Sequence, residues 1–374
     1  MTMQKSVRNI SLRRRARRIG LLALWLLAGT MVPCILASAP AGVPDPRWKH
    51  VRLSGAADFL PVRIVAYDEP WEQVAQDVRE RLAARVTGRG VRVGFYGHGA
   101  FVSPAEVQDN VVFVAGLGVA AGMDVMLFPQ WRFPETNPLR DIPRQILQEQ
   151  LHTPLRNPGE TVVEVARSKM RQLAQENRYA TAHAAVRLAQ GIYALQAQHM
   201  TPALVAFSNS AIVLVRLGEL LEQGTVSDGR AVLAVADDVR QGLSVTNIVT
   251  FGYPLPNGVV ALALRRRVQG AFVNVVPAQC WQQLAGNFLL RGSVENVLVP
   301  WAPAHASWPQ LAPQGPEVTV LGAFLGGRST AWGELLTSGP APGTPGLLHW
   351  SRLLPDTLCE YMLRFDPDTA FGRP

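Results

Sequence analysis

The residue with the clearest chemical potential is a serine placed between a short apolar strand and a helix. Residues 202–207 predict the strand, Ser208 follows it, and residues 211–221 predict the helix. A serine hydroxyl becomes a good nucleophile only when a neighbouring base takes its proton. A sharp strand-to-helix turn can expose that hydroxyl if the residues two before and two after it are small. Ala206 and Ser210 meet this condition, although the usual pattern has glycine at both positions, so Ser208 is a candidate nucleophile.

Two other interpretations of this junction stay open. Serine is a common N-cap residue, so Ser208 could serve only to begin the helix. Ser210 is a rival nucleophile, but the residue two positions after it is the bulky Ile212, which fits a sharp turn poorly.

The elements that must position this serine alternate between strands and helices. Short apolar strands are expected at 60–67, 91–96, 124–128, 202–207, 247–251, 287–291 and 318–321. Helices are expected at 71–86, at 161–199 as one or two helices, and at 211–221, and the segment 129–160 predicts a long surface loop. This alternation indicates an α/β fold with a mostly parallel central sheet flanked by helices.

The net charge of +8 does not indicate a nucleic-acid partner once it is located. Of the 36 basic residues, seven lie in residues 1–44, where no acidic residue occurs. The rest of the chain therefore has 29 basic residues against 28 acidic ones and is nearly neutral. We expect no nucleic acid as a partner, because such binding depends on clustered positive charge.

The N-terminus predicts export. A basic segment ends at Arg18, an uncharged apolar stretch follows, and small residues lie at 37–41. This pattern is typical of a cleaved signal peptide over 1–41, or of an uncleaved anchor in which residues 19–41 attach the protein to the membrane. Either way we expect residues 42–374 to be periplasmic, secreted, or anchored with the body outside the cytoplasm.

Cysteines and motifs predict no metal and no cofactor. Removal of the signal would leave Cys280 and Cys359, either as a disulfide or as two buried thiols. The chain contains no CxxC pair, nucleotide-binding glycine fingerprint or HExxH motif, so the sequence predicts neither a metal site nor a bound cofactor.

Several segments together resemble the α/β-hydrolase superfamily, especially esterases and lipases related to hormone-sensitive lipase. Residues 96–102 are similar to the H-G-G-G-F-like oxyanion loop of that family, and residues 206–211 stand where it has G-D-S-A-G-G. Residues 117–135 resemble its next strand segment, residues 291–300 its acid-bearing turn, and residues 346–350 its late histidine loop. The resemblance covers roughly residues 91 to 350, and no single motif in it is complete.

This resemblance implies a catalytic triad of Ser208, Glu295 and His349 in the family's Ser–acid–His order. His349 would act as the base, and Glu295 would orient it and stabilise its protonated form. His305 is a rival base, although it follows Glu295 by only ten residues. Glu295 could also be an ordinary solvated turn residue.

The resemblance also assigns an oxyanion hole and a cap. Backbone N–H groups of Gly99 or Ala100 and of Asn209 would stabilise the tetrahedral oxyanion, while His98 would shape the loop. The segment 136–200 would form a helical cap or lid on the α/β-hydrolase domain of residues 42–374. Trp131, Phe133 and Tyr179 could line an acyl pocket.

The expected function is an exported serine hydrolase that cleaves small-molecule or lipid carboxylic esters through an acyl-enzyme. The alternative is a catalytically inactive hydrolase fold that serves as a binding protein of the cell envelope. The loss of both elbow glycines favours this alternative.

Overall fold

The computed structural model describes residues 45–53, 59–83, 89–100, 104–134, 142–152, 158–252, 258–277, 290–291, 294–299, 313–327 and 348–349. The predicted signal or anchor at 1–41 lies outside these residues, as do His305 and the three cysteines. Within the described segments, no helix combines the length and the apolar composition needed to cross a bilayer.

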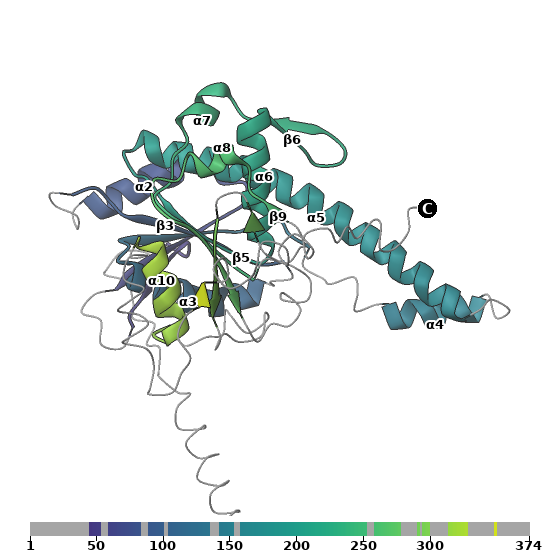
Figure 1. The fold of residues 1–374 in the computed structure, drawn as a ribbon. Coiled ribbons are helices and arrows are strands. Elements are labelled where there is room, and N and C mark those ends of the chain that lie inside the picture. Colours follow the sequence, from purple (N-terminus) through teal and green to yellow (C-terminus); the bar gives the residue numbers. More distant parts are fainter. Residues whose placement is uncertain are drawn as a thin grey trace, which may run out of the picture.

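One sheet, nine-stranded over the described residues, runs through the centre of the molecule (Figure 1). Its seven central strands are all parallel, and one short antiparallel strand lies at each edge. In order across the sheet the strands are β1 (Trp48–Val51), β2 (Leu60–Val65), β4 (Val125–Pro129), β3 (Val93–Gly97), β5 (Ala203–Phe207), β8 (Ile248–Phe251), β10 (Phe272–Pro277), β12 (Glu295–Val299) and β13 (Leu348–His349).

Helices cover both faces of this sheet (Figure 1). One face carries α3 and α10, and the opposite face carries α2, α5, α6 and α8. The helices are α2 (Trp71–Ala83), α3 (Pro104–Ala121), α4 (Ile142–His152), α5 (Pro158–Ala197), α6 (Asn209–Gln223), α7 (Asp237–Gly242), α8 (Leu262–Arg265) and α10 (Pro316–Leu325). Two small sheets pair β6 (Thr225–Ser227) with β7 (Val232–Ala234), and β9 (Gly258–Val259) with β11 (Leu290–Arg291). The predicted α/β fold with a mostly parallel sheet is confirmed.

The strands bury both of their faces, which explains why they are continuous apolar runs. In β5, Leu204 and Ala206 join the core beneath α2, α5 and α6, whereas Val205 and Phe207 join the core beneath α3 and α10. A parallel strand covered on both sides has no solvent-facing positions to fill with polar residues. A polar residue of this segment can therefore lie only beyond the carboxyl end of β5, where Ser208 follows the strand.

The prediction of a strand at 318–321 is wrong, because these residues lie in α10. Val318 and Leu321 are buried at helical spacing, and Pro316 starts the helix after Gly315. A Cβ added to Gly322 would lie 2.3 Å from the Cβ of Ala120 in α3. Close packing of α10 on α3 therefore overrides the strand propensity of the β-branched residues.

Two further boundaries differ from the predictions. The segment 129–160 is not one loop, since α4 lies within it and α5 begins at Pro158. Only Leu290–Arg291 of the strand predicted at 287–291 lies among the described residues, where it forms β11 beside β9.

The order of strands reverses between β3 and β5. From β3 the chain crosses to β4 on one side, and from β4 it returns through α5 to β5 on the other side of β3. In open α/β sheets, such a reversal separates the connections beyond the carboxyl ends of the two strands and leaves a crevice where ligands bind. His98 follows β3 at this place and Ser208 follows β5, so the topology brings the two predicted site segments together.

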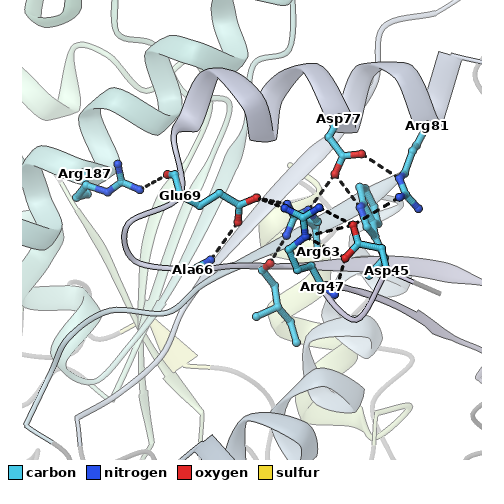
Figure 2. A network of polar contacts seen from close by, with 10 residues as sticks. Asp45, Arg47, Arg63, Ala66, Glu69, Asp77, Arg81 and Arg187 are labelled. Carbon is cyan, nitrogen blue, oxygen red and sulfur yellow. Dashed lines mark hydrogen bonds and ion pairs between the residues drawn. The ribbon is translucent and has the colours of Figure 1, made fainter. Parts of the chain in front are cut away.

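A network of charged residues fixes the edge of the sheet formed by β1 and β2 (Figure 2). Arg63 of β2 has a side chain only 1% exposed, and it pairs with Glu69 and with Asp77 of α2, the latter at 3.1 Å. Asp77 also accepts a hydrogen bond of 2.8 Å from the Trp48 indole of β1. The buried guanidinium therefore connects β1, β2 and α2.

Replacement of Arg63 by Met should lower the free energy of unfolding by about 3 kcal/mol, because it removes the buried charge that Glu69 and Asp77 share and leaves them only the exposed Arg47 and Arg81 as charged partners. Arg81→Met is the matched control, since Arg81 pairs with the same Asp77 but its side chain is 44% exposed. We expect that variant to cost at most about 1 kcal/mol. Urea unfolding at pH 7 measures both, and equal losses would contradict the role assigned to Arg63.

Candidate active site

Ser208 has a backbone conformation that L-amino acids rarely adopt. Its φ is 53° and its ψ is −116°, in the turn between β5 and α6. Its N–H donates to the carbonyl of Phe251 at the end of β8 (3.0 Å), and its own carbonyl accepts from the N–H of Ala211 (2.9 Å). Such conformations cost about 1–3 kcal/mol and persist where surrounding structure imposes them, often at functional sites.

The capping alternative does not account for this serine. Ser208 is the N-cap residue of α6, but its side chain makes no capping hydrogen bond. A serine selected only as a cap would use its hydroxyl in this way and would have ordinary extended backbone angles. The side chain is almost buried, with the residue 8% exposed.

The glycine loop after β3 lies against the start of α6. A Cβ added to Gly97 would lie 2.5 Å from the Cβ of Ser210, and one added to Gly99 would lie 3.1 Å from the Cβ of Ser208. The Ser210 hydroxyl also donates a hydrogen bond of 2.5 Å to the carbonyl of His98. Ser210 therefore joins helix to loop, and the structure places Gly99 beside Ser208, whereas the oxyanion-hole roles of Gly99, Ala100 and Asn209 stay a prediction.

His98 holds the glycine loop through both of its ring nitrogens. Nδ1 lies 2.7 Å from the carbonyl of Gly99, and Nε2 lies 3.0 Å from the backbone nitrogen of Trp131. Since the Trp131 N–H must donate, Nε2 accepts and the Nδ1–H donates to Gly99. Burial lowers the pKa of His98 to about 4, so the ring is neutral near pH 7. With both nitrogens bonded to backbone, His98 positions the loop and does not serve as the base for Ser208.

A side-chain contact ties the long helix α5 to the same turn. Asn209 donates a hydrogen bond from its side-chain amide to the side-chain oxygen of Asn177. From Ala180 onwards α5 packs into the core on the sheet, whereas its earlier part extends away from the body with α4 beside it (Figure 1). The predicted cap segment 136–200 therefore combines this projecting part with a helix that covers the sheet, and its role as a cap stays a prediction.

The described backbone does not bring Glu295 next to Ser208. Glu295 is the first residue of β12, and the strand register places it level with Val205, three strands away from β5. From usual strand spacings, its α-carbon lies roughly 17 Å from that of Ser208. The acid of a triad is expected beyond the carboxyl ends of the strands, so the role of Glu295 stays a prediction.

His349 lies at the correct level but at the far edge of the sheet. It pairs with Val297, whose register leads through Val275 and Phe251 to Phe207, the residue before Ser208. Four inter-strand steps separate β13 from β5, which amounts to about 19 Å. The structure thus joins Ser208 to its predicted oxyanion loop but not to the predicted base.

A histidine–carboxylate pair that the sequence did not indicate lies on α5. His183 Nε2 is 3.0 Å from an oxygen of Asp228, and the Tyr179 ring lies 4.3 Å from the imidazole. Hydrogen bonds from the N–H groups of Ala231 and Arg230 lower the pKa of Asp228. The pair attaches the β6–β7 hairpin to α5, and its partners are 45 residues apart, so no local pattern could reveal it.

The aromatic residues of the predicted acyl pocket differ in how far they are buried. Trp131 and Phe133 are buried in the core, and Tyr179 is 42% exposed. Among the described residues, no group of three or more His, Cys, Asp and Glu side chains could hold a metal ion.

No protein-family model matches this chain, and no curated protein matches it either. One solved structure that the chain matches is described as "Crystal structure of an uncharacterized protein from Pseudomonas aeruginosa". It shares 12% identity at a TM-score of 0.28, over 68% of this chain and 49% of that one. The matched part thus spans about half of that structure, and a likeness of this size carries no argument about activity.

Replacement of Ser208 by Gly should stabilise the protein by about 1 kcal/mol, because glycine adopts positive φ without strain. Ser208→Ala keeps the strained conformation and is the matched control, with stability near that of the wild type. Guanidinium unfolding at pH 7 ranks the three proteins. A glycine variant less stable than the alanine variant would show that the turn is not strained.

Acid should destabilise the protein through His98. Its pKa is about 4 when folded against 6.5 for an ordinary histidine, so between these pH values the unfolded chain binds more protons. Stability should therefore fall as pH drops from about 6.5 to about 4, by up to about 3 kcal/mol.

Urea unfolding at several pH values tests this expectation. In His98→Gln the slope of the unfolding free energy against pH should fall by the amount that corresponds to about one bound proton. His152→Gln is the control, because His152 is exposed on α4, and it should keep the wild-type slope. The same slope for His98→Gln and the wild type would exclude a buried neutral imidazole.

Proposed function

We propose that this chain is an exported serine hydrolase of the α/β-hydrolase type that cleaves carboxylic esters. The observation that supports it most strongly is the strained Ser208 conformation at the point where the strand order reverses. A residue that only ended a strand or began a helix would have no reason to keep an unfavourable conformation. The adjacent glycine loop provides a second component that ester cleavage needs.

In the proposed reaction the Ser208 oxygen attacks the ester carbonyl carbon while a base takes its proton. Negative charge then develops on the carbonyl oxygen, and N–H groups of Asn209 and of Gly99 or Ala100 would donate to it. The alcohol leaves with the proton, and water later releases the acid from the acyl-enzyme. The glycines matter here because the absence of Cβ atoms lets the loop backbone approach the serine closely.

His349 with Glu295 remains the proposed base and acid, with His305 as the rival base. The strand register places Glu295 and His349 away from Ser208, whereas His305 lies outside the described residues. Separate His349→Ala and His305→Ala variants distinguish the two bases, because loss of the true base should lower kcat by about 10³-fold or more.

A second candidate function follows from the same separation. A chain that retains the serine turn and the loop but lacks a base near them would bind a ligand without cleaving it. The proposed setting is the same for both functions: the periplasm, the exterior, or the membrane surface through residues 19–41.

A fluorophosphonate probe should label the wild-type protein, and the adduct should map to Ser208 by peptide mass spectrometry. Ser208→Ala should abolish labelling and lower p-nitrophenyl ester turnover by about 10³-fold or more. Ser244→Ala is the control, because its hydroxyl only accepts a bond from Gln269 and lies away from the loop. An adduct on Ser210 would reassign the nucleophile. A folded protein without any label would favour the binding protein.

A further inference from the structure

Two arginines enclose one tyrosine at the carboxyl edge of the sheet. Tyr67 follows β2, Arg132 follows β4, and Arg187 belongs to α5. The guanidinium carbon of Arg132 lies 4.3 Å from the centre of the Tyr67 ring, and that of Arg187 lies 6.0 Å from it. The edge therefore presents two cationic groups on one aromatic side chain.

Neither of these arginines forms an ion pair with a carboxylate of the described residues. Other arginines do so, for example Arg63 with Glu69 and Arg89 with Asp124. Arg187 donates to the backbone carbonyl of Glu69, as Figure 2 shows, and its Nε has no partner among the described residues. Burial lowers the pKa of Arg187, since desolvation penalises its charge.

The acidic groups nearby do not neutralise this pair. The Glu69 carboxylate is already bound by Arg47 and Arg63. Asp68 and Glu72 attract Arg187 through space, but both are exposed and neither is bonded to it in the described part of the chain. Water around the exposed Asp68 and Glu72 screens their attraction, so the two guanidiniums keep most of their capacity to bind an anion.

Further buried donors without described partners belong to a residue that contacts Arg187 and to the two residues that precede Arg132 in the chain. They are Nε1 of Trp71, Nε2 of Gln130 and Nε1 of Trp131. The guanidinium carbon of Arg187 lies 5.6 Å from the centre of the Trp71 ring. The backbone N–H of Gln130 donates to the carbonyl of Val65, two residues before Tyr67. Since buried polar groups are normally hydrogen-bonded, the unpartnered Trp71 N–H beside Arg187 fits a ligand with acceptor oxygens.

A short path of contacts connects this place to Ser208. Arg132 follows Trp131, whose N–H binds His98, and His98 fixes Gly99 beside Ser208. In the sheet, β4 is separated from β5 only by β3, which corresponds to about 10 Å. A single extended molecule could reach from the serine to the two arginines.

We propose that Arg132 and Arg187 bind an anionic group, a carboxylate or a phosphate, at the end of the substrate that Ser208 attacks. The inference rests on the proposed function, which supplies the position of the ester. Guanidinium groups recognise both anions through paired N–H···O bonds, and the stacked tyrosine holds them in place. The substrate class is therefore an ester whose acyl chain ends in a negative charge and is long enough to span the two strand spacings, about 10 Å, between β5 and β4.

Paired substrates test this proposal. Mono-p-nitrophenyl suberate and the p-nitrophenyl ester of 8-(phosphonooxy)octanoic acid carry a terminal anion, and p-nitrophenyl octanoate is the neutral match. The measured quantity is the ratio of kcat/KM for each anionic ester to that for the neutral ester. We expect the wild type to prefer at least one anion by about tenfold, and the preferred ester identifies carboxylate or phosphate.

Arg132→Met should abolish this preference, and since Arg132 is exposed the variant should fold. Arg187→Lys keeps a charge but loses the planar donors, so it should reduce the preference without removing the positive charge. Arg266→Met is the control because Arg266 is exposed on α8's C-terminal side, and its ratio should equal the wild-type ratio. A wild-type ratio near one, or one unchanged in Arg132→Met, would overturn the proposal.

Calorimetry with Ser208→Ala separates this inference from the proposed function. Suberate monoamide and octyl phosphate are the probes, and octanamide is the neutral control. Anion binding that Arg132→Met removes would support the site even if the wild type hydrolyses no ester, in which case only the hydrolase proposal fails. Equal binding of anionic and neutral probes would overturn the site even if Ser208 is labelled.

Discussion

The close approach of two backbones at the reversal of strand order is the constraint on which the rest of the site depends. The loop after β3 can lie against the first turn of α6 only because Gly97 and Gly99 have no Cβ atoms. Ser210 then joins the two with a hydrogen bond to the loop. With β8 holding the N–H of Ser208 from the other side, the serine has no room to relax into an ordinary conformation. Strain at one residue is thus maintained by packing among several.

The neutral state of His98 follows from the same packing. A charged imidazole would be buried against Phe133 and Phe128 with no carboxylate in the described surroundings, so desolvation keeps the proton off. Only the neutral ring can both donate to Gly99 and accept from Trp131. The loop geometry therefore depends on a protonation state, which couples the shape of the candidate oxyanion hole to acidic pH without giving His98 a chemical step.

How far the sequence could predict this arrangement depended on the range of the interactions. The β5–Ser208–α6 unit was predictable because a buried parallel strand must be apolar and because a turn needs small flanking residues. The helix at Pro316–Leu325 was not, since its β-branched residues favour a strand until the contact of Gly322 with α3 is known. The distance of Glu295 from Ser208 could not be predicted either, because a motif gives the order of residues along the chain but not the register between strands. His98 could be assigned to the loop, but its bond to Trp131 joins residues 33 positions apart.

Two arginines near the carboxyl edge of the sheet differ in how their buried charge is compensated. At the outer corner, Arg63 is surrounded by carboxylates from α2 and the preceding turn, so its burial is compensated and its role is to hold β1, β2 and α2 together. One helix away, Arg187 is partly buried with a backbone carbonyl as partner, and Arg132 stacks on Tyr67 with no described carboxylate. Arg63 has two carboxylate partners, whereas Arg187 has none among the described residues. That the chain leaves this cation and the Trp71 N–H beside it uncompensated, at the carboxyl edge that also carries the strained serine, argues that their acceptor is supplied by a bound molecule rather than by the protein.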